Sequence, residues 1–184
     1  AYVIQDPTAI ADAVNGLISF LPQLTATKAV DKSSFEPKAS QSYDLTYTLS
    51  IKNTSTRNSG TKPIEVDGQT INAVVLLDEL PANTTFKSAK ANNSKALVLY
   101  PLGQDKFTQQ IPNDKSLINT LVVAYPQALA ANATETVELV VTMNSNISRT
   151  SISNIFSVEH GLVSSIKKTL SNEVVTTVGG SSSI

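Results

Sequence analysis

The side chains that could do chemistry are few and far apart in this sequence. The 184-residue chain has no cysteine and one histidine, His160. A cysteine nucleophile is therefore excluded, and a single imidazole makes a zinc site or a catalytic triad hard to build. Asp78 and Glu79 are adjacent at the end of an apolar run, but neighbours in a strand point to opposite faces, which suits an acid–base pair poorly. We interpret these two residues as a turn cap and His160 as a polar turn residue.

Loop aspartates leave one alternative that involves a metal. Asp67, Asp105 and Asp114 lie in expected loops, without the alternating spacing of a calcium-binding loop. An isolated calcium site built from loop oxygens is the alternative. The chain has 7 glycines, and neither a glycine-rich phosphate loop nor a nucleophile elbow is present. The sequence therefore predicts no catalytic residue, no metal and no cofactor, and we expect a protein that is not an enzyme.

Charge and composition limit the classes of partner that this chain could bind. Charged residues make up 16% of the chain, and 14 Lys and Arg against 15 Asp and Glu give a net charge of −1. Such a balance predicts no broad attraction to nucleic acid or to an anionic membrane. Ser, Thr and Asn take the place of charged residues, as is common in cell-surface and matrix proteins. No apolar run approaches the ~20 residues that span a bilayer.

Alternation of apolar and polar residues predicts an all-β fold. Residues 43–51 and 137–143 are apolar at every second position, and residues 152–158 follow the same alternation except at Asn154, which is typical of half-buried strands. Residues 73–77 form a continuous apolar run, which predicts a strand buried on both faces. Other strands are expected at 64–66, 69–71, 96–100, 121–125 and 174–178. About eight to ten short strands divided by turn signals predict a β-sandwich.

Turn residues set the expected strand boundaries. Asp67-Gly68 lies between two short strands and suits a tight type I′ hairpin turn. Pro101 and Pro126 are expected to close the strands that precede them. We expect one sandwich over residues 24–178, followed by a flexible tail over residues 179–184.

Residues 1–23 differ from the rest of the chain. Asp6-Pro7 is suited to start a helix, and Pro22 would end it. The alternative is an extended segment with a strand over residues 17–21. In either form the segment offers apolar side chains for assembly with another copy: Val3, Ile4, Ile10, Val14, Leu17, Ile18, Phe20 and Leu21. Ala1 suits a terminus left by removal of a signal peptide, and it suits an arbitrary boundary equally well.

Four segments resemble one family of surface-protein repeats. They are LTATKAVD at 24–31, YDLTYTLSIKNT at 43–54, VVLLDELPANTTF at 74–86 and SNEVVTTV at 171–178. Together they resemble the conserved-repeat domain known as domain of unknown function eleven. The resemblance implies an immunoglobulin-like sandwich in a bacterial or archaeal surface protein, where such domains usually form tandem arrays. Here one copy is visible, with an inserted middle and without a recognisable sorting signal or membrane anchor.

The resemblance to surface sandwiches also suggests a covalent cross-link. In some of these domains a lysine of the first strand bonds to an asparagine of the last strand, helped by a buried carboxylate. Lys28 and Asn172 occupy such positions, so they are the candidate pair for an isopeptide bond. Burial would lower the pKa of the lysine and make its amine nucleophilic. Glu138 could assist only from an inward position, and its place in the alternation predicts that it points outward.

Glycosylation is a further expectation from the sequence. Asn-x-Ser/Thr acceptor motifs occur at Asn53, Asn83, Asn92, Asn132 and Asn146. Most of them fall in expected loops or strand ends, where a glycan would have room.

Three functions remain open at this stage. The first is an extracellular structural subunit that forms a homopolymeric filament by strand exchange through residues 1–23, because an open sheet edge can accept a strand from a neighbour. The second is a spacer, adhesin or lattice module that does not polymerise. The third is a carbohydrate-binding module, which the absence of tryptophan and the 5% aromatic content disfavour.

Overall fold

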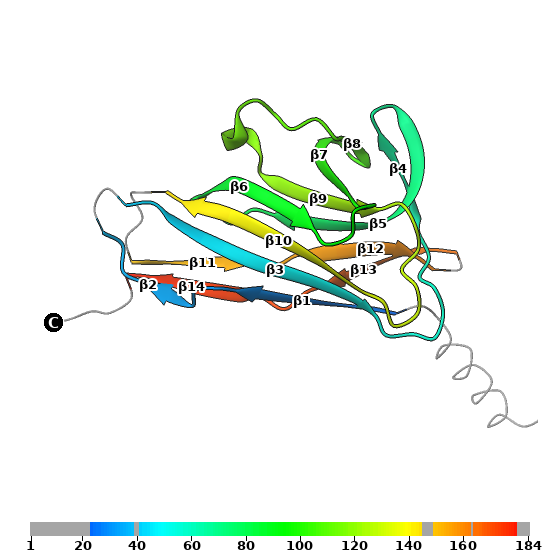
Figure 1. Cartoon of the computed structure of the whole chain (residues 1–184), viewed down its shortest axis with the longest axis horizontal. Helices are drawn as coiled ribbons and strands as arrows, with labels where there is room; N and C mark the ends of the chain where they lie inside the picture. Colours follow the sequence, from blue (N-terminus) through cyan, green and yellow to red (C-terminus); the bar gives the residue numbers. More distant parts are fainter. Residues whose placement is uncertain (1–22, 39–40, 145–148, 163, 180–184) are drawn as a thin grey trace, which may run out of the picture.

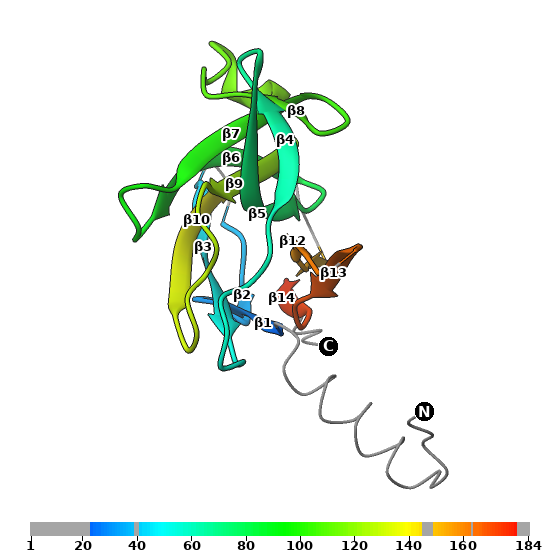
Figure 2. The same ribbon diagram turned by 90° about the vertical axis from the view of Figure 1, so that its right-hand side faces the viewer.

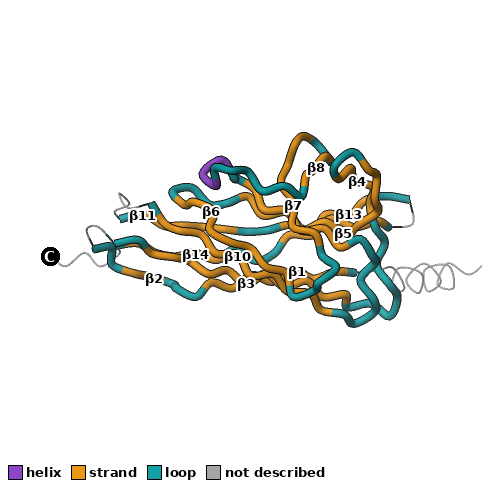
Figure 3. Tube along the Cα trace, turned by 45° about the horizontal axis from the view of Figure 1, so that its top comes forward, coloured by secondary structure: helices purple, strands orange, loops and turns teal. Residues whose placement is uncertain are grey.

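The computed structural model describes residues 23–38, 41–144, 149–162 and 164–179. This part of the chain is built from strands, with one short 3-10 helix, η1 (Lys115–Leu117) (Figure 3). The segment 1–23, for which helix and donor strand were the alternatives, lies outside the described residues apart from Gln23. The tail 179–184 lies outside them apart from Gly179. No helix among the described residues is long and apolar enough to cross a membrane.

The strands follow one another along the chain as the alternation predicts, with several additions. The first half contains β1 (Leu24–Val30), β2 (Ser34–Phe35), β3 (Tyr43–Asn53), β4 (Lys62–Val66), β5 (Gln69–Glu79), β6 (Thr84–Ala91), β7 (Leu97–Gly103) and β8 (Lys106–Thr108). The second half contains β9 (Thr120–Tyr125), β10 (Thr134–Met143), β11 (Thr150–Asn154), β12 (Ser157–Gly161), β13 (Ile166–Leu170) and β14 (Val174–Val178). Strands β2, β6, β8 and β13 were not expected, because β2 and β8 are too short to show an alternation and β6 and β13 lack a clear one.

One layer of the sandwich is an antiparallel sheet with the order β1-β3-β10-β6 (Figure 1). In β3 the alternating residues Leu45, Tyr47, Leu49 and Ile51 are all fully buried. Glu138 of β10 is exposed, as its place in the alternation predicts. The two strands with the clearest period of two, β3 and β10, are thus neighbours at the centre of this sheet.

The opposite layer contains a long hairpin that is interrupted in the middle. β11 pairs with β14 and β12 pairs with β13, so residues 150–161 run antiparallel to residues 166–178. The prediction of one strand over residues 152–158 is wrong in this respect. Between β11 and β12 the amide of Phe156 donates to Ser171 Oγ (3.0 Å), and the amide of Ser171 donates to Phe156 O (2.9 Å). A serine side chain therefore replaces a ladder partner and breaks the strand.

The middle of the chain adds a second, smaller core. Five strands form a closed ring of pairings, in the order β5–β4–β8–β7–β9 and back to β5. Figure 2 shows β4, β7 and β8 on one side of the sandwich. The residues inside this small barrel-like unit are Ile64, Val66, Ala73, Val75, Leu99, Phe107, Val122 and Ala124.

Strand β5 is buried on both faces because it belongs to both cores. Val74 and Leu76 face the sandwich core, and Ala73 and Val75 face the small unit. β9 is shared in the same way. The continuous apolar run at residues 73–77 is therefore explained, and the predicted burial on both faces is confirmed.

The turn and proline expectations have mixed outcomes. Asp67 and Gly68 have φ values of 48° and 85°, which are the positive angles of a type I′ turn between β4 and β5. β9 ends at Tyr125, before Pro126, as predicted. Pro101 does not end β7, which runs on to Gly103. The pairing of β7 with β8 shifts register between these two residues, and an irregular ladder tolerates a proline that has no amide donor.

Candidate functional site: a buried lysine–aspartate centre

A lysine and an aspartate meet inside the sandwich core. Lys28 comes from β1 and Asp78 from β5, and both side chains are 0% exposed. The Nζ of Lys28 contacts Oδ2 of Asp78 directly. Alternation places them there: Lys28 lies two residues after the buried Ala26, and Asp78 lies two residues after the buried Leu76. Fully buried lysine and aspartate side chains are rare in proteins, so this pair calls for an explanation.

Burial shifts the two groups toward their neutral forms. Loss of solvation lowers the pKa of the Lys28 amine, and the contact with Asp78 opposes that shift. Loss of solvation likewise raises the pKa of the Asp78 carboxyl against the opposing effect of Lys28. Desolvation is the larger cause for both groups. The arrangement therefore favours an uncharged amine beside a protonated carboxyl.

Two aromatic rings lie against the amine of the pair. The Lys28 Nζ lies 4.6 Å from the centre of the Tyr47 ring and 5.8 Å from that of Phe156. Both aromatic residues are almost completely buried. Burial is the main cause that raises the pKa of the Tyr47 hydroxyl. The amine is thus buried beside two aromatic rings, and its side chain is inaccessible to bulk water.

An asparagine side chain completes the centre. Asn154, the last residue of β11, is 4% exposed, and its Nδ2 donates to the carbonyl of Glu79 (2.9 Å). Glu79 is the residue that follows Asp78, and the Asn154 side chain is one of the groups that oppose the burial-driven rise in the pKa of the Asp78 carboxyl. The Oδ1 atoms of Asn154 and Asp78 are both buried, and neither has a hydrogen-bond partner. Buried polar atoms without partners are uncommon and often mark functional sites.

Asn172 also meets Lys28, but through the main chain. Its Oδ1 accepts from the Lys28 amide (2.8 Å) and its Nδ2 donates to the Lys28 carbonyl (2.9 Å). The asparagine amide thereby acts as a ladder neighbour for β1. The structure brings the two residues of the sequence-predicted pair together, whereas the Lys28 amine points to Asp78. A covalent bond between Lys28 and Asn172 stays a prediction.

Two members of this centre were missed from the sequence. Asp78 was interpreted as a turn cap, and that interpretation is wrong because β5 continues through it to Glu79. Asn154 was placed in an alternating strand without a role. The signal was available in both cases: each is a polar residue at a position that alternation assigns to the core.

The sequence-based prediction for His160 is also wrong. It was expected in a turn, but it lies in β12 and is 0% exposed. Its Nδ1 lies 3.2 Å from the carbonyl of Gly161, and its Nε2 has no partner. Burial lowers the pKa of the imidazole, which keeps the ring neutral. His160 is therefore a core residue of the hairpin.

The loop aspartates do not come together. Asp67 accepts from the amide of Gln109 (3.2 Å), and Asp114 accepts from the amide of Ser116 (2.9 Å) at the start of η1. Asp105 binds Lys62 instead (2.8 Å). The described residues contain no group of three or more metal-ligating side chains.

The glycosylation motifs differ in their accessibility. Asn53 is 0% exposed, and its Nδ2 donates to the carbonyls of Arg57 (2.7 Å) and Leu129 (2.9 Å). A glycan has no room there, so the expectation for Asn53 is wrong. Asn83, Asn92 and Asn132 are exposed, and Asn146 lies outside the described residues. At these four positions glycosylation stays a prediction.

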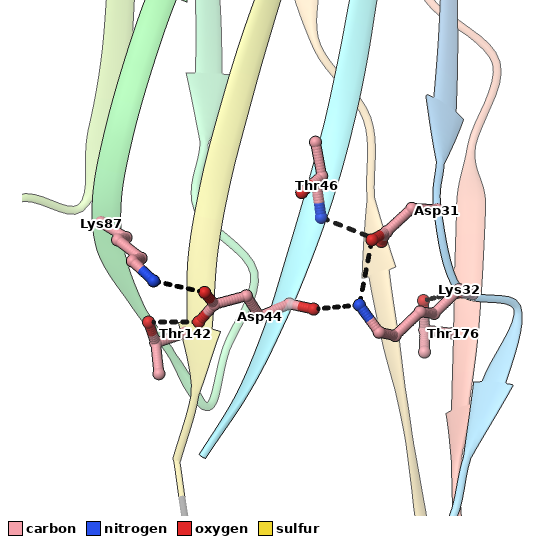
Figure 4. Close-up of polar contacts among 7 residues, drawn as sticks. All are labelled: Asp31, Lys32, Asp44, Thr46, Lys87, Thr142 and Thr176. Atoms are coloured by element: carbon pink, nitrogen blue, oxygen red, sulfur yellow. Dashed lines mark hydrogen bonds and ion pairs between the residues drawn. The ribbon is translucent and has the colours of Figure 1, made fainter.

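A second polar cluster joins neighbouring strands on the molecular surface (Figure 4). Asp44 of β3 accepts from Lys87 of β6 (2.5 Å) and from Thr142 of β10 (2.9 Å). Lys32 donates to the Asp44 carbonyl (2.7 Å), and its own carbonyl accepts from Thr176 of β14 (2.6 Å). The cluster therefore links the β1-β3-β10-β6 sheet to the sheet that contains β14.

This cluster predicts a small dependence of stability on pH. The hydrogen bond from Lys87 is the main cause that lowers the pKa of Asp44 below its usual 3.8. A lowered folded-state pKa contributes stability above the unfolded-state value, and this contribution is lost as the pH falls through the folded value. Asp44→Asn should cost about 0.2–1 kcal/mol near neutral pH, because the pair is partly exposed. In urea denaturation the difference from the parent chain should shrink progressively as the pH falls below 3.8, the usual pKa of the carboxyl, and a constant difference would contradict this account.

Comparison with known proteins shows similarity in fold but not in sequence. No family model matches the chain. No curated protein matches it either. The full-length major pilin SpaD from Corynebacterium diphtheriae has a TM-score of 0.50 and 18% identity over 84% of this chain. A putative membrane anchored protein from the same organism has a TM-score of 0.51 and 11% identity over 87% of the chain.

A third similar structure is BcpA, the major pilin subunit of Bacillus cereus, with a TM-score of 0.49 and 9% identity over 85% of this chain. The chain spans only 35%, 36% and 40% of the lengths of SpaD, the membrane anchored protein and BcpA. At these identities the likeness shows the fold alone. The protein has an all-β, immunoglobulin-like sandwich of the type also found in pilins.

Proposed function

We propose that this chain is a structural module of an extracellular, cell-surface filament, and that copies associate by strand exchange through residues 1–23. The observation that carries the proposal is an edge strand with exposed apolar side chains. β13 is the last strand of its sheet and has one ladder partner among the described strands, β12. Ile166 and Leu170 on this strand are 49% and 59% exposed. An edge of this kind can pair with a strand from another chain.

The surroundings of β13 suit an apolar strand. A groove of about 360 Å³ lies beside Leu170. Its apolar lining includes Leu77, Leu80, Pro81 and Ile155. Burial of apolar side chains in this groove would stabilise a docked strand by roughly 25 cal/mol for each Å² removed from water.

Charge favours residues 1–23 of a second copy as the occupant. This segment contains Asp6 and Asp12 and no lysine or arginine. β13 presents Lys167 and Lys168, both exposed. Insertion of one copy into the next is a heterologous contact, so repetition gives an open filament.

The other functions receive less support. Each aromatic residue in the described part of the chain is buried or half-buried, and the half-buried Phe35 and Tyr43 pack against each other at 4.8 Å. An exposed aromatic platform for a carbohydrate is therefore absent from the described surface. The buried lysine–aspartate centre is closed to a diffusing substrate, which argues against an enzyme. Export by a signal peptide, glycosylation and membership of the conserved-repeat family are further parts of the proposal.

Introducing negative charge at two apolar positions of β13 tests the assembly edge. The Ile166→Asp/Leu170→Asp variant should abolish filaments in negative-stain electron microscopy, because a docked strand would bury two carboxylates. Sedimentation of the full chain should show a shift from polymer to monomer. Removal of residues 1–22 should have the same effect.

The matched control is Leu102→Asp, which changes another exposed leucine, on β7 and outside the groove. This variant should assemble like the parent chain. Filaments that persist without residues 1–22 would rule out exchange through that segment. A parent chain that stays monomeric at every concentration would favour a spacer or adhesin module.

A further inference from the structure

We propose that the amine of Lys28 forms an amide bond with the side chain of Asn154, and that Asp78 is the catalytic acid and base for this step. The bond would join β1 of one layer to β11 of the other inside the sandwich core. It differs from the pair predicted from the sequence, in which Asn172 was the partner of Lys28. The inference concerns this chain alone and holds whether or not copies polymerise.

The placement of the two asparagines favours Asn154 as the electrophile. Both polar atoms of the Asn172 amide are held by the main chain of Lys28, at the opposite end of that lysine side chain from its Nζ. The Asn154 Nδ2 donates to the carbonyl of Glu79 (2.9 Å), the residue that follows Asp78, and the Lys28 Nζ contacts Asp78. The Asn154 Oδ1 accepts no hydrogen bond and is free to accept one from the protonated Asp78.

The reaction balances without an added reagent. The lone pair of the neutral Lys28 amine attacks Cγ of Asn154, while the protonated Asp78 donates a hydrogen bond to Oδ1. Asp78 then relays a proton from Nζ to Nδ2. The Cγ–Nδ2 bond breaks, ammonia leaves, and a secondary amide remains between Nζ and Cγ. Asp78 ends in its starting form, as a general acid–base catalyst does.

The burial of the centre supplies the conditions for this chemistry. A neutral amine is the nucleophilic form of lysine, and burial lowers the pKa of Lys28 in that direction. The rings of Tyr47 and Phe156 shield the amine from water. Strand packing holds amine, acid and amide together, which replaces a collision by an intramolecular step.

A direct amide between Lys28 and Asp78 is the competing product, with loss of water. It would need a second carboxyl to move the protons. Among the described residues Asp78 is the one buried carboxylate, and Glu138 is exposed. The arrangement therefore assigns Asp78 to catalysis and Asn154 to bond formation.

Intact mass spectrometry of the full chain under denaturing conditions tests the proposal. The parent chain should have a mass one ammonia below the calculated value. Fragmentation after proteolysis should show one branched peptide that joins Lys28 to Asn154. The unmodified mass, a loss of water, or a branch at Asn172 or Asp78 would overturn it.

Variants separate the roles of the residues. Lys28→Arg, Asn154→Ala and Asp78→Ala should each restore the calculated mass, whereas Asn172→Ala should keep the loss of one ammonia. Circular dichroism shows whether each variant retains its β-structure. If a folded Asp78→Ala variant still forms the bond, Asp78 is not the catalyst. A folded Asn172→Ala variant with the full calculated mass would also contradict the proposal.

Discussion

Asp78→Ala is expected to lower the free energy of unfolding by at least about 3–5 kcal/mol, because it leaves the Lys28 amine buried without its partner. The amine is fully buried, and no other carboxylate is buried among the described residues. Any covalent bond that depends on Asp78 would add to this loss. Guanidinium denaturation, followed by circular dichroism, measures the change.

Two variants serve as controls for this prediction. Asp105→Ala also removes a carboxylate from a lysine, Lys62, but the Asp105 side chain is 48% exposed. Its cost should stay within about 1 kcal/mol. Asn154→Ala leaves the contact between Lys28 and Asp78 in place, so it reports the loss of the cross-link and of one hydrogen bond. Equal costs for the Asp78 and Asp105 variants would show that burial of the pair has no energetic consequence.

The second large effect is expected at a close approach of two backbone segments. A Cβ atom added to Gly161, at the end of β12, would lie 2.3 Å from the carbonyl oxygen of Thr61. A Cβ added to Gly60 would lie 2.1 Å from the carbonyl oxygen of Gly161. Both obstacles are backbone atoms, which cannot rotate away as a side chain can.

Gly161→Ala should therefore cost about 3 kcal/mol, the upper end of the usual range for overpacking. Thermal unfolding should show a clearly lower midpoint. The control is Gly103→Ala, because a Cβ there would meet nothing within 4 Å. A Gly161→Ala variant with the stability of the Gly103 control would show that the two segments separate at little cost. Gly60→Ala should have an effect similar to that of Gly161→Ala, because it affects the same crossing.

The sandwich itself was predictable from the sequence because alternation is a local property. A strand with one buried face has a period of two, and β3 and β10 show this period over their whole lengths. The type I′ turn at Asp67-Gly68 is equally local, since two residues determine its geometry. Where the ladder is irregular, as at Pro101 and around Phe156, prediction of the strand bounds failed. Those irregularities depend on a register shift and on a distant serine side chain.

The candidate centre was only partly predictable. Lys28 was singled out, and its inward position follows from the same alternation. Asp78 was assigned to a turn because a carboxylate after an apolar run usually ends a strand. Its role depends on the contact between β1 and β5, because Lys28 and Asp78 are fifty positions apart in the chain.

The all-β class and the shortage of catalytic side chains follow from the amino-acid sequence alone, because alternation and turn residues are local properties and composition does not depend on the fold. Which polar residues meet the Lys28 amine depends on how the two layers pack. Asn154 and Asn172 are both asparagines near strand ends, and the resemblance to surface sandwiches pointed to Asn172 alone. The packing of the two layers brings Asp78 to the Lys28 amine, places the Asn154 amide against the backbone of Glu79, next to Asp78, and pairs the Asn172 amide with the Lys28 backbone. The long-range contacts that make this choice form only when the sheets close over a common core.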